Sequence, residues 1–111
     1  MFFNDKITAD SKAAVGWTTA ATLEEASQIA QGLVTVGLAR CTQVSAPITS
    51  TYTWKGQIET ETEYRITIKF LSSQAQGIET YLNEHHSYET PQWIWVEASG
   101  ASEAYGKWLS E

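Results

Sequence analysis

Two long stretches of alternating residues, joined by a short polar turn, limit the folds open to this chain more than any other feature. Residues 41–54 place Tyr52 and Trp54 on one face of an extended strand and several threonines on the other. Residues 57–70 alternate in the same way, with a row of glutamates opposite a largely apolar face. Together the two stretches predict a β-hairpin with long arms.

The turn of this hairpin, at Lys55-Gly56, sets the pairing of its arms. A loop of only these two residues would pair Tyr52 with Glu59 and so mix an apolar face with a charged one. We therefore expect a three-residue loop or a bulge, with Gly56 at the position that needs a positive φ.

The length of the hairpin predicts self-association. Each arm would extend roughly 45 Å, whereas a chain of this size has a radius of gyration of only ~13 Å. The tip would then overhang the domain and expose Tyr52, Trp54 and Ile58, which a second copy of the chain can cover. The alternative is a shorter hairpin that curls over its own core.

Shorter patterns on either side of the hairpin predict the remaining elements. They are a strand at 13–19, a helix at 22–37 capped by Thr22 and Gly37, a helix from Ser72 or Ser73 to Glu84, a strand at 93–98 and a terminal helix at 101–110. This order predicts an α+β domain of the ferredoxin-like split βαβ type with one added helix. We expect a single domain at residues 13–111, preceded by a loose leader at 1–12.

The last predicted strand has apolar residues on both faces. Trp93 and Trp95 alternate with Ile94 and Val96. In a single-layer sheet with helices on one side, the second face is either covered by a neighbouring subunit or left exposed. This strand therefore also favours an oligomer.

The charge balance of the chain argues against several classes of partner. Its 13 acidic and 7 basic residues give a net charge of −6, which disfavours nucleic acid and anionic membrane surfaces. No apolar run approaches the ~20 residues of a membrane span, and the first residues lack a signal-peptide pattern. We expect a cytoplasmic protein, and the single Cys41 fits a reducing compartment.

Two adjacent histidines, His85 and His86, are the candidate metal ligands. Neutral imidazoles bind Cu²⁺ and Zn²⁺ well, and Glu89 could add a carboxylate, with a second subunit completing the set. This is the hypothesis of a weak, partly shared copper or zinc site. The alternative, which we favour, is that the histidines cap the second helix, whose C-terminus suits their charge.

The other polar residues give no catalytic pattern. The row of Glu59, Glu61 and Glu63 can gather hard cations but more often solvates an exposed strand face, and a lone Cys41 is more often a buried small hydrophobe. The chain has no glycine-rich phosphate loop and no CxxC or HExxH motif, and no Ser-His-Asp set can be assigned. We therefore expect a binding protein and not an enzyme.

Residues with a characteristic spacing recur along nearly the whole chain. They are Cys41, Val44, Ser50, Tyr52, Trp54, Gly56, Ile58, Glu63, Lys69, His86, Tyr88, Pro91, Tyr105, Trp108 and Leu109. This pattern resembles the CutA family of divalent-cation tolerance proteins. The resemblance implies a homotrimer of ferredoxin-like subunits packed sheet to sheet and linked by long hairpins, similar in architecture to the PII signalling proteins.

The resemblance also implies roles for particular residues. Glu63 matches the family pattern, and we expect it to pair across a subunit boundary with a cation of another chain, for instance Arg40, Arg65 or Lys69. A cysteine and a glutamate linked to metal association in the family are replaced here by Thr18 and Gln92, which are poor ligands. The expected trimer interface comprises Tyr52, Trp54, Ile58, Glu63, Trp93 and Trp95.

The resemblance thus implies a trimer linked to tolerance of divalent cations, copper among them, and we expect it to act by metal binding. The alternative is a PII-like trimeric signalling module that binds a small molecule or a protein in the clefts between subunits.

Overall fold

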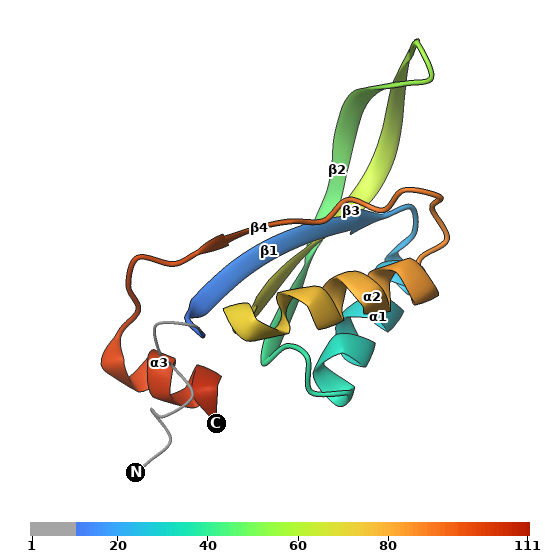
Figure 1. Cartoon of the computed structure of the whole chain (residues 1–111). Coiled ribbons are helices and arrows are strands. Elements are labelled where there is room, and N and C mark those ends of the chain that lie inside the picture. Colours follow the sequence, from blue (N-terminus) through green and yellow to red (C-terminus); the bar gives the residue numbers. More distant parts are fainter. Residues whose placement is uncertain (1–10) are drawn as a thin grey trace.

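Four antiparallel strands form a single sheet, and two of the helices cover one of its faces. The structure, a computed structural model, describes residues 11–111. Its elements are β1 (Ala13–Ala20), α1 (Leu23–Thr35), β2 (Cys41–Trp54), β3 (Gln57–Leu71), a short 3₁₀ helix (Ser72–Gln74), α2 (Ala75–His85), β4 (Ile94–Glu97) and α3 (Glu103–Ser110). The strand order is β2-β3-β1-β4, and α1 and α2 cover the same face (Figure 1). The predicted α+β class and order of elements are confirmed.

The core lies between the sheet and the two covering helices. Its largest fully buried side chains come from β3, α1 and α2 and include Ile66, Ile68, Phe70, Leu33, Ile78 and Leu82. Burial of each such side chain stabilises the fold by about 1.5–3 kcal/mol. Their spacing is the period of two along β3 and the helical period along α1 and α2, which is why the sequence predicted these elements.

The tryptophans at the last strand close this core at one edge. The Trp93 and Trp95 rings lie 5.6 and 5.8 Å from the Phe70 ring, measured between centroids. Gly16 on β1 makes room for them, because a Cβ there would lie 2.6 Å from two atoms of the Trp93 ring. Ile94 and Val96 point the other way and are 60% and 51% exposed. We call the sheet face that they share with Val15 and Trp17 the open face.

The hairpin turn contradicts the expected three-residue loop. Trp54 pairs directly with Gln57 and Tyr52 with Glu59, so the loop is the two residues Lys55 and Gly56. Both have a positive φ, 51° and 79°, as in the turn whose twist matches a right-handed hairpin. Gly56 was therefore correctly placed. The mixed face is tolerated because the tip lies outside the core, with the Tyr52 and Trp54 side chains partly exposed.

A bulge does occur, but at the base of the hairpin. The register shifts between Val44 and Pro47, and the Ser45 hydroxyl accepts the Arg65 N–H at 2.9 Å. Beyond this point the arms project from the body (Figure 1), and the molecule measures 52 × 24 × 24 Å. The hairpin overhangs as predicted, and it does not curl over the core.

The helix ends follow the predictions in part. The Thr22 hydroxyl accepts the Glu25 N–H at 3.1 Å, and Gly37 has the left-handed φ of 83° after α1. The expected cap of the second helix by Ser72 or Ser73 is wrong. These hydroxyls bond instead to the chain before β1, the Lys12 N–H and the Ser11 hydroxyl, and a 3₁₀ turn leads into α2.

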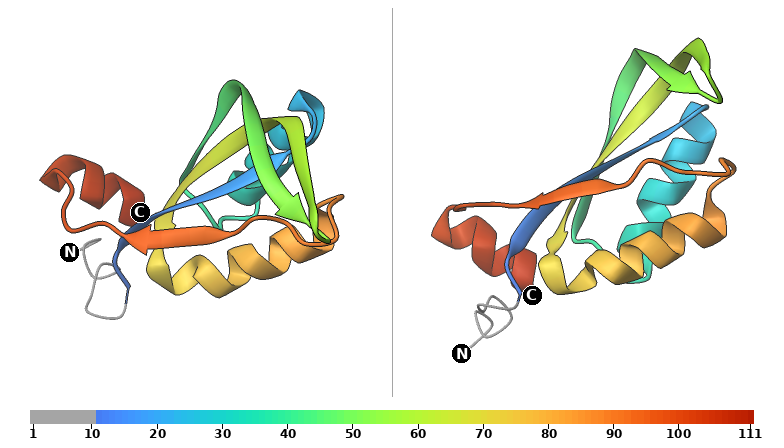
Figure 2. Two further views of the ribbon diagram at one scale, coloured as in Figure 1. Left: turned by 90° about the horizontal axis from the view of Figure 1, so that it is seen from above. Right: turned by 45° about the horizontal axis from the view of Figure 1, so that its top comes forward.

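Two views from other directions show α3 beyond the end of the sheet that lies opposite the hairpin tip (Figure 2). Within residues 11–111, no helix combines the length and the apolar character needed to cross a bilayer. Most of the predicted leader, residues 1–10, lies outside the described part of the chain.

Candidate functional site at the base of the hairpin

A buried carboxylate, Glu63, begins a polar network where the hairpin leaves the sheet. Glu63 lies on β3 and is 7% exposed, and the Tyr88 hydroxyl donates to its Oε2 at 2.8 Å. Tyr88 belongs to the connector between α2 and β4. Burial, followed by the hydrogen bond to Glu63, raises the pKa of Tyr88, so the hydroxyl remains a donor at neutral pH. Within one chain the partner of Glu63 is thus the Tyr88 hydroxyl, and the expected pairing with a cation of another subunit stays a prediction.

His86 holds the start of this connector with both ring nitrogens. Its side chain is fully buried. Nε2–H donates to the Thr19 carbonyl at 2.6 Å, and Nδ1 accepts the Tyr88 N–H at 3.0 Å. These two bonds require the neutral imidazole with its proton on Nε2. The ring therefore joins the end of β1 to the connector and aims Tyr88 at Glu63.

Glu25 ties the connector to the first turn of α1. The N–H and the hydroxyl of Ser87 donate to its two carboxylate oxygens, at 2.8 and 3.0 Å. Glu25 Oε2 also lies 3.7 Å from His86 Nδ1. Thr22 and Glu25 have the spacing of a capping box, in which the glutamate side chain bonds to the backbone N–H of the N-cap residue. Only half of that box forms, because the carboxylate binds the connector.

A groove of about 770 Å³ opens beside this network, between the hairpin and the connector. Its aromatic and larger polar side chains are Tyr52, Trp54, Glu63, Tyr88, Glu89 and Gln92. Partial burial and then the carboxylates of Glu61, Glu63 and Glu59 raise the pKa of Tyr52. The groove is thus aromatic and acidic, a combination that favours cations over anions.

The described residues do not form a metal centre within one chain. No group of three or more His, Cys, Asp or Glu side chains among residues 11–111 is placed to hold an ion. His86 in particular has no lone pair to offer, since Nδ1 accepts a hydrogen bond and Nε2 carries its proton. A metal ion does not fit the histidine pair as the structure arranges it.

The predicted metal ligands therefore have different roles in the structure. His85 is the last residue of α2, stacks on Tyr81 and donates from Nδ1 to the Tyr81 carbonyl at 2.9 Å, which leaves Nε2 without a partner in the described chain. This hydrogen bond caps the C-terminal end of α2, which is the alternative that we favoured for His85. Glu89 is exposed and lines the groove. Thr18 is buried, and the Gln92 side-chain amide donates to the Trp17 carbonyl at 3.5 Å.

The predicted interface residues fall into two groups. Tyr52, Trp54 and Ile58 are 41%, 41% and 77% exposed on the hairpin. Trp93 and Trp95 instead lie partly buried on the core side, and Ile94 and Val96 form the exposed apolar surface of β4. The sequence showed that both faces of this strand are apolar but could not tell which face the helices cover.

Sequence reasoning missed the roles of Tyr88, Glu25 and the Thr19 carbonyl. Tyr88 was noted only as part of a spaced motif, and the contact to Glu63 spans 25 residues. A backbone carbonyl leaves no signal in a sequence. The burial of His86 had one available clue, since an extended residue directly after a helix end turns its side chain away from that of its neighbour.

Comparison with known proteins finds a matching family and similar relatives. A family model described as CutA1 divalent ion tolerance protein matches residues 14–111. The chain is 39% identical over 89 residues to a probable divalent-cation tolerance protein CutA homolog of Encephalitozoon cuniculi, covering 80% of this chain and 77% of that protein. It is 37% identical over 86 residues to a CutA homolog of Xenopus laevis, covering 78% of this chain but only 57% of the Xenopus protein.

A solved structure agrees with this match. It is the periplasmic divalent cation tolerance protein CutA of Archaeoglobus fulgidus, which superposes with a TM-score of 0.84 at 30% identity and covers 87% of this chain and 94% of that one. The matching fold and the near-complete family match lead to one conclusion: this chain belongs to the CutA1 divalent ion tolerance protein family.

Proposed function

We propose that this protein takes part in tolerance of divalent cations, copper among them, as a homotrimer of ferredoxin-like subunits that binds its ligands and catalyses no reaction. The observation that carries the proposal is the unpartnered apolar surface of the open face and the hairpin. Ile94, Val96 and Ile58 are each more than half exposed, on a molecule whose hairpin projects far beyond its body. Apolar surface of this kind is typical of a contact between subunits.

The assembly can be tested by charging the open face. Ile94→Lys places a cation at the centre of the proposed interface, and we expect native mass spectrometry to show loss of the trimer. Val36→Lys is the matched control, because Val36 is 58% exposed but lies at the end of α1 in the helix layer. A monomeric wild-type protein at micromolar concentration, or equal behaviour of the two variants, would refute the proposed interface.

Cation binding is proposed to use ligands from more than one chain. Within one chain the exposed candidates are His85, through Nε2, and Glu89, whereas His86 serves the fold. The acidic groove supplies a favourable field for a cation at this end of the molecule. His85 and Glu89 are thus proposed as half of a shared site.

Calorimetric titration with Cu²⁺ tests this division of roles. We expect His85→Ala and Glu89→Gln to weaken binding, and His86→Ala to lower stability. Glu84→Gln, at an exposed position one residue before His85, is the control for a general loss of negative charge. Curves for His85→Ala that match those of the wild type would remove His85 from the site.

A second candidate function is supported by the size of the groove. Its volume of about 770 Å³ lies in the range of small-molecule sites, so a PII-like module with an organic ligand between subunits is the alternative. Native mass spectrometry of protein purified without added metal separates the two. Retained copper or zinc supports the first function, and a retained organic ligand supports the second.

The cytoplasm remains the proposed location. The solved Archaeoglobus relative is described as periplasmic, so the location needs its own test. Cell fractionation with a tagged chain is that test, and recovery with periplasmic markers would contradict the proposal.

A further inference from the structure

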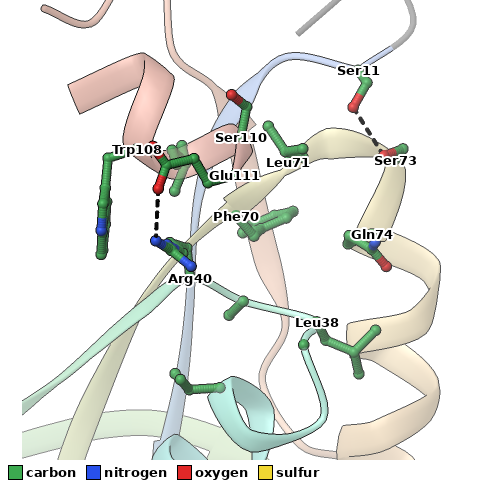
Figure 3. Close-up of a pocket in the computed structure, with 14 residues that line it drawn as sticks. Ser11, Leu38, Arg40, Phe70, Leu71, Ser73, Gln74, Trp108, Ser110 and Glu111 are labelled. Carbon is green, nitrogen blue, oxygen red and sulfur yellow. Dashed lines mark hydrogen bonds and ion pairs between the residues drawn. The ribbon is translucent and has the colours of Figure 1, made fainter. Parts of the chain in front are cut away.

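A second cavity lies at the other end of the molecule, between α3, the turn after α1 and the end of β3 (Figure 3). Its volume is about 660 Å³. About half of its wall is apolar and is formed mainly by Val34, Leu38, Ala39, Phe70, Trp108 and Leu109. It shares no lining residue with the groove at the hairpin base, so the proposed cation function does not use it.

One positive charge, Arg40, lines this cavity beside its apolar wall. The Arg40 backbone N–H donates to the Lys69 carbonyl at 3.0 Å, which fixes the residue just before β2. Its guanidinium carbon lies 4.6 Å from the centre of the Trp108 ring. The cation is thus held against an aromatic wall of the cavity.

The hydrogen bonds of this guanidinium are incompletely satisfied. Nε is buried and has no hydrogen-bond partner among residues 11–111. The only carboxylate that reaches the group in that range is Glu111, whose Oε1 lies 3.3 Å from Nη2. A guanidinium can bind a carboxylate through two parallel hydrogen bonds, and here only one is made.

The contact with Glu111 shows that the Arg40 guanidinium binds a carboxylate. Glu111 puts a carboxylate on Arg40 beside the indole of Trp108, at the mouth of the cavity (Figure 3). The Glu111 side chain is 54% exposed, so its ion pair is partly screened by solvent and is easily exchanged. A ligand that carries its own carboxylate and an apolar body could take this place and also cover the apolar wall.

We infer that this cavity binds a small carboxylate with an apolar body, with Arg40 as the anion-binding residue, Trp108 and Phe70 as walls and Glu111 as an internal competitor. The competitor role follows because both carboxylates would bind the same guanidinium, which Glu111 already contacts through Nη2. Binding would therefore strengthen when the Glu111 charge is removed and weaken when the Arg40 charge is removed.

Calorimetry and NMR with octanoate test the inference on the full chain. Octanamide is the neutral control of the same length. We expect octanoate to bind about tenfold more tightly than octanamide, since a hydrogen bond to a charged partner is worth about that factor. NMR shifts should centre on Leu38, Phe70 and Trp108.

Two variants with opposite expected effects make the result decisive. Arg40→Gln should reduce octanoate affinity about tenfold and leave octanamide unchanged, whereas Glu111→Gln should raise octanoate affinity. Arg65→Gln, on the exposed sheet surface outside the cavity, should change neither. Glu111→Gln removes only a partly exposed pair, so it should fold even if Arg40→Gln does not.

Three results would overturn the inference. They are no octanoate binding to the wild type at millimolar concentration, equal affinity for octanoate and octanamide, or weaker octanoate binding by Glu111→Gln.

Discussion

The hydrogen bond from Tyr88 to Glu63 gives the sharpest test of how the hairpin base is held. Tyr88→Phe removes one hydroxyl and leaves the ring in place. In the wild type this hydroxyl donates at 2.8 Å to a carboxylate that is 7% exposed. A hydrogen bond to a charged group contributes about 1.5–3 kcal/mol, so the variant should lose that much free energy of unfolding.

A double-mutant cycle separates this bond from packing effects. In a Glu63→Gln background the acceptor is a neutral amide, and the same Tyr88→Phe change should cost only about 0.5–1.5 kcal/mol. The coupling energy between the two positions is then about 1 kcal/mol. The assay is urea denaturation at one fixed protein concentration, because assembly makes stability depend on concentration. Equal costs in the two backgrounds would refute the charge-assisted bond.

Alkaline pH offers an independent test of the same contact. The pKa of Tyr88 is raised in the folded chain above the usual value of 10.0, first by burial and then by Glu63. Between the unfolded and folded pKa values the folded state binds more protons, so stability falls as pH rises above about 10. The wild type should lose stability more steeply there than Tyr88→Phe. Parallel curves would show that the hydroxyl titrates as in the unfolded chain.

Five further substitutions test the fold. Gly16→Ala should cost about 1–3 kcal/mol, because its Cβ would lie 2.6 Å from the Trp93 ring, whereas Gly100→Ala, with nothing within 4 Å, should change the unfolding free energy little. Gly56→Ala should cost about 1–2 kcal/mol at φ 79°, and Lys55→Asn, a residue that adopts a positive φ readily, should not destabilise the hairpin. Thr22→Ala should lower stability by about 1 kcal/mol through the lost cap of α1. Each is measured by urea denaturation, and equal values for Gly16→Ala and Gly100→Ala would contradict the contact of position 16 with Trp93.

The sequence predicted the elements well because their signals are local. The alternation along β2 and β3, the cap at Thr22 and the turn glycine at Gly56 each depend on neighbours in the chain. The loop length was wrong because the prediction assumed that both arms keep consistent faces to the tip. That rule applies where one face is buried, and the tip of this hairpin is not.

The site was predicted less well because its contacts are distant in sequence. His86 meets the Thr19 carbonyl, and Glu63 meets Tyr88, only after the sheet has formed. A hydroxyl donor to Glu63 was not considered, since carboxylates in a sequence suggest cations as partners. Within its own chain Arg40 stacks on Trp108 and pairs with Glu111 at the far end of the molecule, and the expected pairing of Glu63 with a cation of another chain stays a prediction.

The two histidines show how one helix end separates residues of the same type. His85 is the last residue of α2 and its ring bonds back to the Tyr81 carbonyl, while His86 has extended backbone angles that carry its ring into the space between β1 and α1. The end of α2 therefore leaves the His85 imidazole at the surface and places the His86 imidazole in the interior, where it stabilises the connector. A variant at His86 would disturb the connector, Tyr88 and the groove together. Loss of cation binding in such a variant would thus not identify a ligand, whereas the same loss at His85 would.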